Sequence, residues 1–134
     1  NVISMVFSDV RLKKFIEIRI ADSLPQEYAL AYLALIKGLF INIDITYNFI
    51  TSLGNIKKAD IELGKISIIN LGYNGTIYNK KAFELIDQIL DIAYKNLNEL
   101  DKKYLQLLIE LANNKVTLSQ IHKSKLNLKE GQKW

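Results

Sequence analysis

The sequence has no cysteine, and it has only one histidine, one proline, one methionine and one tryptophan among 134 residues. The absence of cysteine excludes disulfides and thiolate metal sites. The single histidine, His122, excludes a multi-histidine site within the chain, and we expect it to lie on the surface of a helix. A chain without cysteine is compatible with a reducing compartment, so we expect a cytoplasmic location.

Basic clusters and long apolar runs are also scarce. The net charge of +4 comes from 18 basic and 14 acidic residues, and Arg11 and Arg19 are the only arginines. Because the lysines are spread along the chain, with only a loose group near the C-terminus, the pattern does not favour nucleic-acid binding. No apolar run approaches the ~18–20 residues of a membrane span and no signal peptide is visible, so we expect no membrane partner.

The chain does have the length and composition of one globular domain, with 49% hydrophobic and 24% charged residues. It opens without an initiator methionine, already within a strand-like apolar run over 2–7. Such a start is typical of a piece of a longer protein, so we expect residues 1–134 to form a single segment of a larger one.

Residues 15–20 alternate in the manner of a β-strand. The isoleucines would point to one face, whereas Phe15, Glu17 and Arg19 would point to the other. Glu17 and Arg19 would then lie about 6.5–7 Å apart along the strand. This spacing suits a carboxylate on a metal ion and a guanidinium on the phosphate that the ion neutralises. The alternative is an antiparallel strand with one solvated face, against which the aromatic Phe15 argues mildly.

A helix is expected over 27–40, where the sequence is apolar almost all round. Ser23 and Gln26 resemble a capping box, and Pro25 fits the first turn. Because this helix lacks a polar face, we expect it to be buried on several sides, partly by chain outside the segment.

Shorter elements are expected next. Asp44 would cap a helix that runs through Leu53 and ends at Gly54, and a helical turn over 56–63 would stop at Gly64.

Residues 65–79 predict a loop or hairpin, with Asn74-Gly75 as its tight turn. The stretch 72–75, Gly-Tyr-Asn-Gly, is a weak candidate for a phosphate loop. It lacks the spaced glycines and the lysine of a nucleotide-binding motif, so we favour an ordinary loop.

Three further helices complete the prediction. Asn79 would cap the clearest one, Asp101 would start the next, and Thr117 with Gln120 forms a capping box for a short helix near Ile121. The first of these helices has its inward residues at intervals of three and four: Phe83, Ile86, Leu90, Ala93 and Leu97. The second has Tyr104, Leu105, Leu108, Leu111 and Ala112 inward. Residues 127–134 are polar and are expected to be loosely held.

Asp87 and Asp91 lie one helical turn apart in the first of these helices and could share a cation. On an amphipathic helix such pairs usually belong to the solvated face, and we favour that interpretation.

The strand and its surroundings resemble the signature region of glutamate–cysteine ligases. Residues 9–22, Asp-Val-Arg-Leu-Lys-Lys-Phe-Ile-Glu-Ile-Arg-Ile-Ala-Asp, are similar to the family phrase V-R-L-K-x-[YF]-[IL]-E-[IVM]-R-x-A-D. The resemblance is to the plant and bacterial types and to the ligase half of bifunctional glutathione synthetases. Residues 33–40 resemble the helix that follows in the family. Residues 93–97 and 111–118 resemble its closing helices, although Lys115 and Leu118 replace the glycine and proline common there.

The resemblance implies ATP-dependent formation of γ-glutamylcysteine, the first step of glutathione biosynthesis, from glutamate and cysteine through a γ-glutamyl phosphate. It implies that Glu17 is a ligand of Mg²⁺ and that Arg19 is a catalytic residue that contacts the transferred phosphoryl group. Mg²⁺ prefers carboxylate oxygens, and the planar arginine fork suits phosphate oxygens. Arg11 is a weaker candidate for contacting the nucleotide phosphates.

We therefore expect an α+β, mainly helical fragment. One or two N-terminal strands of a larger antiparallel active-site sheet, within 1–22, would precede about five or six helices over 23–128 and a loose tail over 129–134. The remaining metal ligands would belong to the rest of the catalytic domain, so the segment alone would be inactive.

Two alternatives stay open. In one, a related carboxylate–amine ligase uses a different amine, whose selectivity would lie outside this segment. In the other, the chain is a stand-alone helical interaction module whose binding surface is the apolar helix 27–40, which predicts a large exposed apolar patch.

Overall fold

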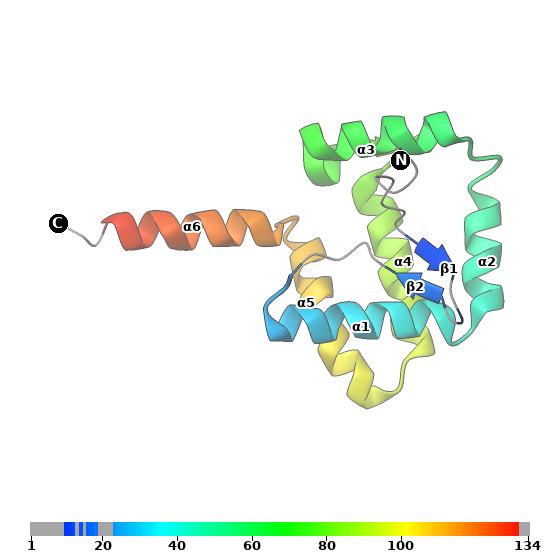
Figure 1. Cartoon of the computed structure of the whole chain (residues 1–134), viewed down its shortest axis with the longest axis horizontal. Coiled ribbons are helices and arrows are strands. Elements are labelled where there is room, and N and C mark those ends of the chain that lie inside the picture. The colour runs from blue at the N-terminus through cyan, green and yellow to red at the C-terminus, as the bar shows by residue number, and fades with distance from the viewer. Residues whose placement is uncertain (1–9, 13, 15, 19–22, 132–134) are drawn as a thin grey trace.

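The computed structural model describes residues 10–12, 14, 16–18 and 23–131. Within them the chain forms six α-helices and two small antiparallel hairpins, so the predicted α+β, mainly helical fold is confirmed (Figure 1). The elements are β1 (Val10–Leu12), β2 (Ile16–Ile18), α1 (Gln26–Phe40), α2 (Ile43–Ser52), α3 (Lys58–Leu71), the 3₁₀ turn η2 (Gly72–Asn74), β3 (Thr76–Ile77), β4 (Lys80–Lys81), α4 (Ala82–Asn96), α5 (Glu99–Asn113) and α6 (Leu118–Gly131).

The core forms where α1, α4 and α5 pack together. Its centre is Leu105, which is 0% exposed, and the predicted inward residues Leu90, Ala93 and Leu97 are also buried. The contact face of α1 consists of small residues, Ala31, Ala34 and Gly38. Small side chains allow the helix axes to approach closely, so this face determines how α1 seats on its neighbours.

One expectation about these helices is wrong. Tyr104 was expected to face inward, but it is 40% exposed because it lies on the solvent side of α5. Helix α1 was expected to be buried on several sides, partly by chain outside the segment, and within the described residues its Leu33 is 60% exposed. Only one side of α1 packs against α4 and α5 within the described residues.

Helix α3 passes through Gly64 instead of stopping there. Gly64 is buried, and a Cβ built on it would lie 3.2 Å from Cγ2 of Ile77 in β3. A helical glycine costs up to ~1 kcal/mol relative to alanine. At this position the missing side chain makes room for the hairpin, and the helix continues to Leu71.

The predicted hairpin exists, but its turn lies later than expected. Strands β3 and β4 pair Thr76 with Lys81 and Ile77 with Lys80. The turn between them is formed by Tyr78 and Asn79, whose φ angles are 49° and 64°. Two consecutive positive φ values are typical of the hairpin turns that match strand twist. The turn is therefore not at Asn74-Gly75, and Asn79 does not cap α4, whose N-cap is Lys81.

The helix ends confirm some predicted caps and correct others. The Thr117–Gln120 capping box is present: the Thr117 amide donates to Gln120 Oε1 at 2.8 Å, and the Gln120 amide donates to Thr117 Oγ1 at 3.3 Å. Gly54 follows the last turn of α2 with φ 94°, as predicted. Helix α6 is longer than expected and reaches Gly131, so residues 129–131 of the expected loose tail of 129–134 are helical.

Three predicted N-caps lie elsewhere. Helix α1 has Pro25 at its N-cap and no side-chain cap hydrogen bond, so Ser23 does not cap it. Helix α2 is preceded by Asn42, which places Asp44 inside its first turn. Helix α5 begins at Glu99 rather than at Asp101, because the Asn98 side chain accepts the Asp101 amide at 2.9 Å.

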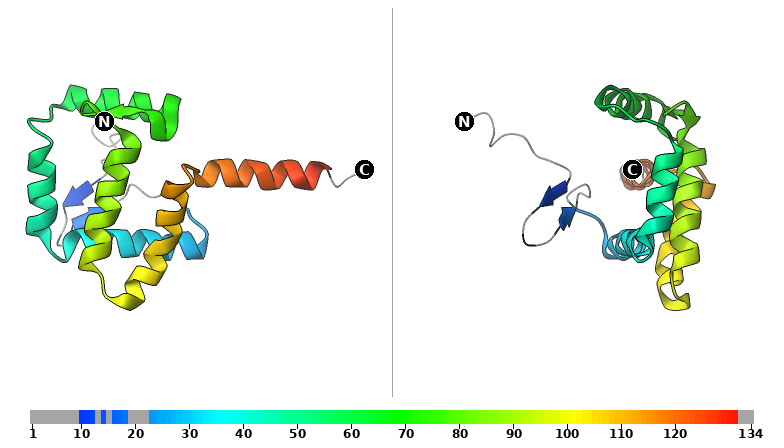
Figure 2. Two further views of the ribbon diagram at one scale, coloured as in Figure 1. Left: turned by 180° about the vertical axis from the view of Figure 1, so that it is seen from behind. Right: turned by 90° about the vertical axis from the view of Figure 1, so that its right-hand side faces the viewer.

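Helices α1, α2, α3 and α4 form an open frame, in which α1 and α3 lie at opposite ends of α2 and α4 runs between them (Figure 1). Helices α1 and α2 meet at an angle of 85°. A second view shows the β1–β2 hairpin standing off the frame on the side that Figure 1 presents to the reader, while α6 projects away from the other helices (Figure 2). Among the described residues no single helix has the length and apolar character of a membrane span, although the bent pair α1–α2 does when taken together.

Candidate functional site

The β1–β2 hairpin brings two of the predicted site residues to facing positions. The strands are antiparallel, and the register places Arg11 opposite Glu17, with Val10 opposite Ile18 and Leu12 opposite Ile16 on either side. Directly opposed residues of an antiparallel pair share one face of the sheet. The register therefore assigns Arg11 and Glu17 to one face, and the four aliphatic residues to the other.

Glu17 is half-buried in the middle of β2, so its carboxylate is partly shielded from solvent. Arg11 lies in the middle of β1. Arg19, the predicted catalytic residue, lies outside the described residues, as does Phe15. The structure thus relates the predicted metal ligand to the weaker of the two arginine candidates.

Sequence reasoning identified β2 but not its pairing partner. The available signal was a second short apolar alternation over 10–12, separated from β2 by a lysine-containing turn that includes Lys14. Three-residue strands are too short for alternation to establish a register, because the turn length and pairing also contribute.

The described residues supply part of a magnesium site at most. No group of three or more histidine, aspartate or glutamate side chains able to hold a metal ion is found among them. Mg²⁺ is commonly held by one or two protein carboxylates together with substrate phosphates and water. A single half-buried carboxylate such as Glu17 fits that ligand chemistry as one contributor, with the other ligands supplied by substrate or by further chain.

The alternative candidates from the sequence, the Asp87–Asp91 pair and His122, all lie on exposed helix faces. Asp91 accepts a hydrogen bond from Lys95 Nζ at 2.6 Å on the exposed face of α4, as expected for a solvated helix face. His122 is exposed on α6, as predicted.

The Gly72–Gly75 loop uses its backbone for folding. The Gly75 amide donates to the Gly72 carbonyl at 3.0 Å, and the Gly75 carbonyl accepts the Ala82 amide at 2.8 Å. A Cβ on Gly75 would lie 2.9 Å from the Ser67 carbonyl oxygen. These contacts join α3 to α4, as expected of an ordinary loop rather than of a phosphate loop.

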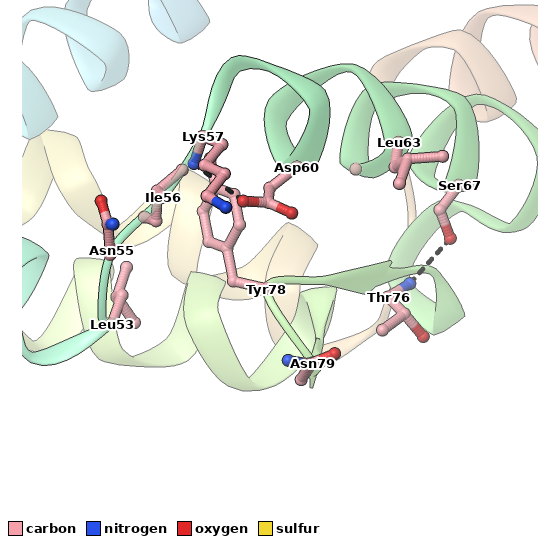
Figure 3. A pocket seen from close by; sticks show the side chains of 11 residues that line it. Leu53, Asn55, Ile56, Lys57, Asp60, Leu63, Ser67, Thr76, Tyr78 and Asn79 are labelled. Atoms are coloured by element: carbon pink, nitrogen blue, oxygen red, sulfur yellow. Dashed lines mark hydrogen bonds between the residues drawn. The ribbon is translucent and has the colours of Figure 1, made fainter.

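A groove of about 590 Å³ lies between α3 and the β3–β4 hairpin, away from β1–β2 (Figure 3). Tyr78 points from the hairpin toward Lys57 and Asp60 at the start of α3. The Lys57 amide donates to Asp60 Oδ2 at 2.7 Å, and the Thr76 amide donates to Ser67 Oγ at 2.8 Å. Sequence reasoning missed this groove because it depends on Gly64 and on the late hairpin turn.

Helices α2 and α3 expose an unusual amount of apolar side chain. Ile69 is 81% exposed, and exposed apolar side chains in such number are typical of elements that pack against further protein. We call the following set the α2–α3 apolar surface: Ile41, Ile43, Ile45, Tyr47, Ile50, Ile61, Leu63, Ile66, Ile68, Ile69 and Leu71.

The resolved pKa shifts arise from structural contacts. Burial raises the pKa of Tyr73, whose hydroxyl donates to the Val116 carbonyl at 3.0 Å and thereby ties η2 to the α5–α6 connection. On the surface of α5, the hydrogen bond from Lys102 lowers the pKa of Glu99 and raises that of Lys102. Neither contact adjoins the β1–β2 hairpin.

Comparison with protein-family models, with curated proteins and with solved structures finds no significant match to this chain.

Proposed function

We propose that this chain is the C-terminal segment of an ATP-dependent glutamate–cysteine ligase, acting in the cytoplasm and inactive when separated from the rest of its catalytic domain. The proposal rests on the resemblance of residues 9–22 to the family signature. The observation that best supports it is the β1–β2 register, which assigns Glu17 and Arg11 to one face of an antiparallel pair and aliphatic residues to the other. A polar face backed by an apolar one is what a sheet lining a phosphate site and covering a core requires.

In the proposed reaction, an oxygen of the glutamate side-chain carboxylate attacks the γ-phosphorus of ATP, and ADP leaves. The cysteine amine then attacks the acyl carbon of the γ-glutamyl phosphate, and inorganic phosphate leaves as the amide bond forms. Glu17 would be one ligand of Mg²⁺, which when bound neutralises phosphate charge. Arg19 would contact the transferred phosphoryl oxygens, where charge develops in the transition state, and Arg11 would support the nucleotide phosphates.

Two features of the segment are typical of a part of a larger domain. A two-stranded hairpin is at best marginally stable alone, and β1–β2 stands off the helices (Figure 2). The α2–α3 apolar surface likewise lacks a cover among the described residues. Further strands and helices of a catalytic domain would bury both, which agrees with a segment of a larger ligase.

The test is phosphate release by the full-length protein with Mg-ATP and glutamate, measured with and without cysteine. We expect cysteine-dependent turnover that is lost in Glu17→Gln and in Arg19→Ala. Glu84→Gln is the matched control, because Glu84 is an exposed glutamate on α4. A folded protein without cysteine-dependent turnover would reject this substrate and favour a related ligase with another amine. Turnover indifferent to both site substitutions would instead make Glu17 and Arg19 part of a solvated strand face.

The second candidate is a stand-alone interaction module, favoured by the α2–α3 apolar surface. Most of the exposed apolar residues lie on α2 and α3, although Leu33 and Phe40 of helix 27–40, where the sequence predicts the binding surface, are exposed as well. A module would tolerate substitution of Glu17 and Arg19 and would form a stable complex or oligomer through this surface.

A further inference from the structure

We propose that the groove between α3 and the β3–β4 hairpin binds a small zwitterion, an α-amino acid with an apolar side chain. Lys57 would bind its carboxylate and Asp60 its ammonium group. The inference goes beyond the proposed ligase activity and does not rest on it, because the groove shares no residue with the β1–β2 hairpin. Its volume of about 590 Å³ lies within the range of small-molecule sites, about 300–1,000 Å³.

The walls of the groove are fixed by contacts within the protein. The Thr76 amide donates to Ser67 Oγ at 2.8 Å and thereby ties the hairpin to α3. The missing side chain of the buried Gly64 lets Ile77 pack against the helix, since a Cβ there would lie 3.2 Å from Cγ2 of Ile77. The groove is therefore formed before any ligand enters, which lowers the cost of binding.

Tyr78 supplies an aromatic wall from an unfavourable backbone position. Its φ of 49° lies in the left-handed region, where hairpin turns favour asparagine, aspartate or glycine over a bulky residue. Its ring is half-buried and points toward Lys57 and Asp60 at the start of α3 (Figure 3). Residues held in this way cluster at binding sites, where the side chain has a use that the turn itself does not require.

The groove carries one available positive and one available negative group. The Lys57 amide donates to Asp60 Oδ2 at 2.7 Å, which fixes the carboxylate and leaves Oδ1 without a hydrogen-bond donor among the described residues. In the same part of the chain, no carboxylate forms an ion pair with the Lys57 ammonium. An α-amino acid has its two opposite charges on one carbon, so it can meet both groups. A phosphate would meet Lys57 but would be repelled by Asp60.

Apolar side chains complete the lining. Leu53 and Ile56 lie in the connection between α2 and α3, and Leu63 lies one turn into α3 from Asp60 (Figure 3). They can contact the side chain of the bound amino acid, and burial of apolar area would then add to its affinity. The lining therefore favours an amino acid such as leucine over glycine.

The experiment is titration of the full-length protein with L-leucine, followed by saturation-transfer NMR. N-acetyl-L-leucine lacks the ammonium group and L-leucinamide lacks the carboxylate, so each loses one of the two charged contacts. We expect each analogue to bind at least about 10-fold more weakly than leucine. Glycine, which lacks the apolar side chain, should also bind more weakly.

Substitutions assign each charge of the ligand to its partner. Lys57→Met should abolish the preference for leucine over leucinamide, because no cation remains for the carboxylate. Asp60→Asn should abolish the preference for leucine over N-acetyl-leucine, while its amide oxygen can still accept the Lys57 amide. The matched controls are Lys58→Met and Glu62→Gln, which change exposed residues of α3 outside the groove and should leave both preferences intact.

Tyr78→Asn separates binding from folding. Asparagine tolerates a positive φ, so we expect unchanged or higher thermal stability by circular dichroism together with loss of leucine binding. The inference would be overturned if the parent showed no saturable leucine binding, if both analogues bound as well as leucine, or if Lys57→Met behaved like Lys58→Met. Leucine binding that is lost in Glu17→Gln but kept in Lys57→Met would also overturn it, since the site would then lie at β1–β2. The comparison of the three ligands in the parent needs no substitution, so it holds even if a variant does not fold.

Discussion

Gly38 of α1 lies directly on Ala93 of α4, so that a Cβ added to Gly38 would be 2.6 Å from the Ala93 carbonyl oxygen and 2.8 Å from the Ala93 Cβ. The Gly38 carbonyl also accepts a hydrogen bond from Asn96 Nδ2 at 3.0 Å. Gly38 and Ala93 are both buried where the two helices cross. This contact determines how closely α1 can approach the rest of the core.

Gly38→Ala should destabilise the protein despite the better helix propensity of alanine. Propensity would contribute up to ~1 kcal/mol in favour of the variant, whereas overpacking against backbone typically costs about 1–3 kcal/mol or more. We expect a lower free energy of unfolding, measured by urea denaturation. Gly64→Ala is the control, since its Cβ would meet only the side chain of Ile77 at 3.2 Å. Equal losses in the two variants would contradict the packing argument.

Thr46→Val should weaken the junction of α1 and α2. The buried Thr46 hydroxyl donates to the Leu39 carbonyl at 2.6 Å, close to the point where the chain turns from α1 into α2. Valine keeps the shape but leaves that carbonyl without its donor, which costs about 1–3 kcal/mol. Thr51→Val removes an exposed hydroxyl and should change the free energy of unfolding by less than about 0.5 kcal/mol. The comparison requires only thermal or urea unfolding.

Tyr73 should make stability fall at alkaline pH. Burial raises the pKa of the folded-state phenol above its ordinary value of 10.0, because the ionised form loses hydration. The contribution is therefore fully present below pH ~10 and is lost as the pH rises through the folded-state value. In Tyr73→Phe, the decline in the free energy of unfolding between neutral pH and pH ~11 should be shallower. Tyr47→Phe, which removes an exposed hydroxyl, is the control; an identical decline in Tyr73→Phe and the parent would contradict the expectation.

Ile69→Glu tests whether the α2–α3 apolar surface is covered in the full-length protein. Ile69 is on the surface of the described segment, so the substitution alone should cost less than about 0.5 kcal/mol if nothing packs there. A covering element would bury the new charge, and the full-length protein should then lose several kcal/mol. Lys123→Glu on the exposed face of α6 is the control for a change in surface charge. A full-length protein indifferent to Ile69→Glu would show that this position stays exposed.

Periodic and capping patterns predicted the helices well where the deciding interactions are local. The intervals of apolar residues in α4 and the Thr117–Gln120 capping box depend on residues within a few positions of one another. Their geometry follows from one helical turn of backbone. The predicted stop at Gly64 was wrong because propensity alone does not reveal that a hairpin packs on that glycine.

At the candidate site, too, local features were predicted from the sequence and contacts between elements were not. The alternation that identified Glu17 is a local property of β2, but its pairing with Arg11 depends on the register between two three-residue strands. The α2–α3 apolar surface could likewise not be predicted from the sequence, because apolar composition does not determine which face of a helix is covered.

The sequence by itself determined that this chain would be mainly helical, with a short N-terminal strand bearing Glu17, since both follow from backbone periodicity and side-chain polarity. Only the tertiary structure decided that Gly38 meets Ala93, that Tyr78 and Asn79 make the hairpin turn, and that Arg11 faces Glu17. These relationships join residues whose approach depends on packing and pairing between elements, and such contacts leave no periodic signal in either partner.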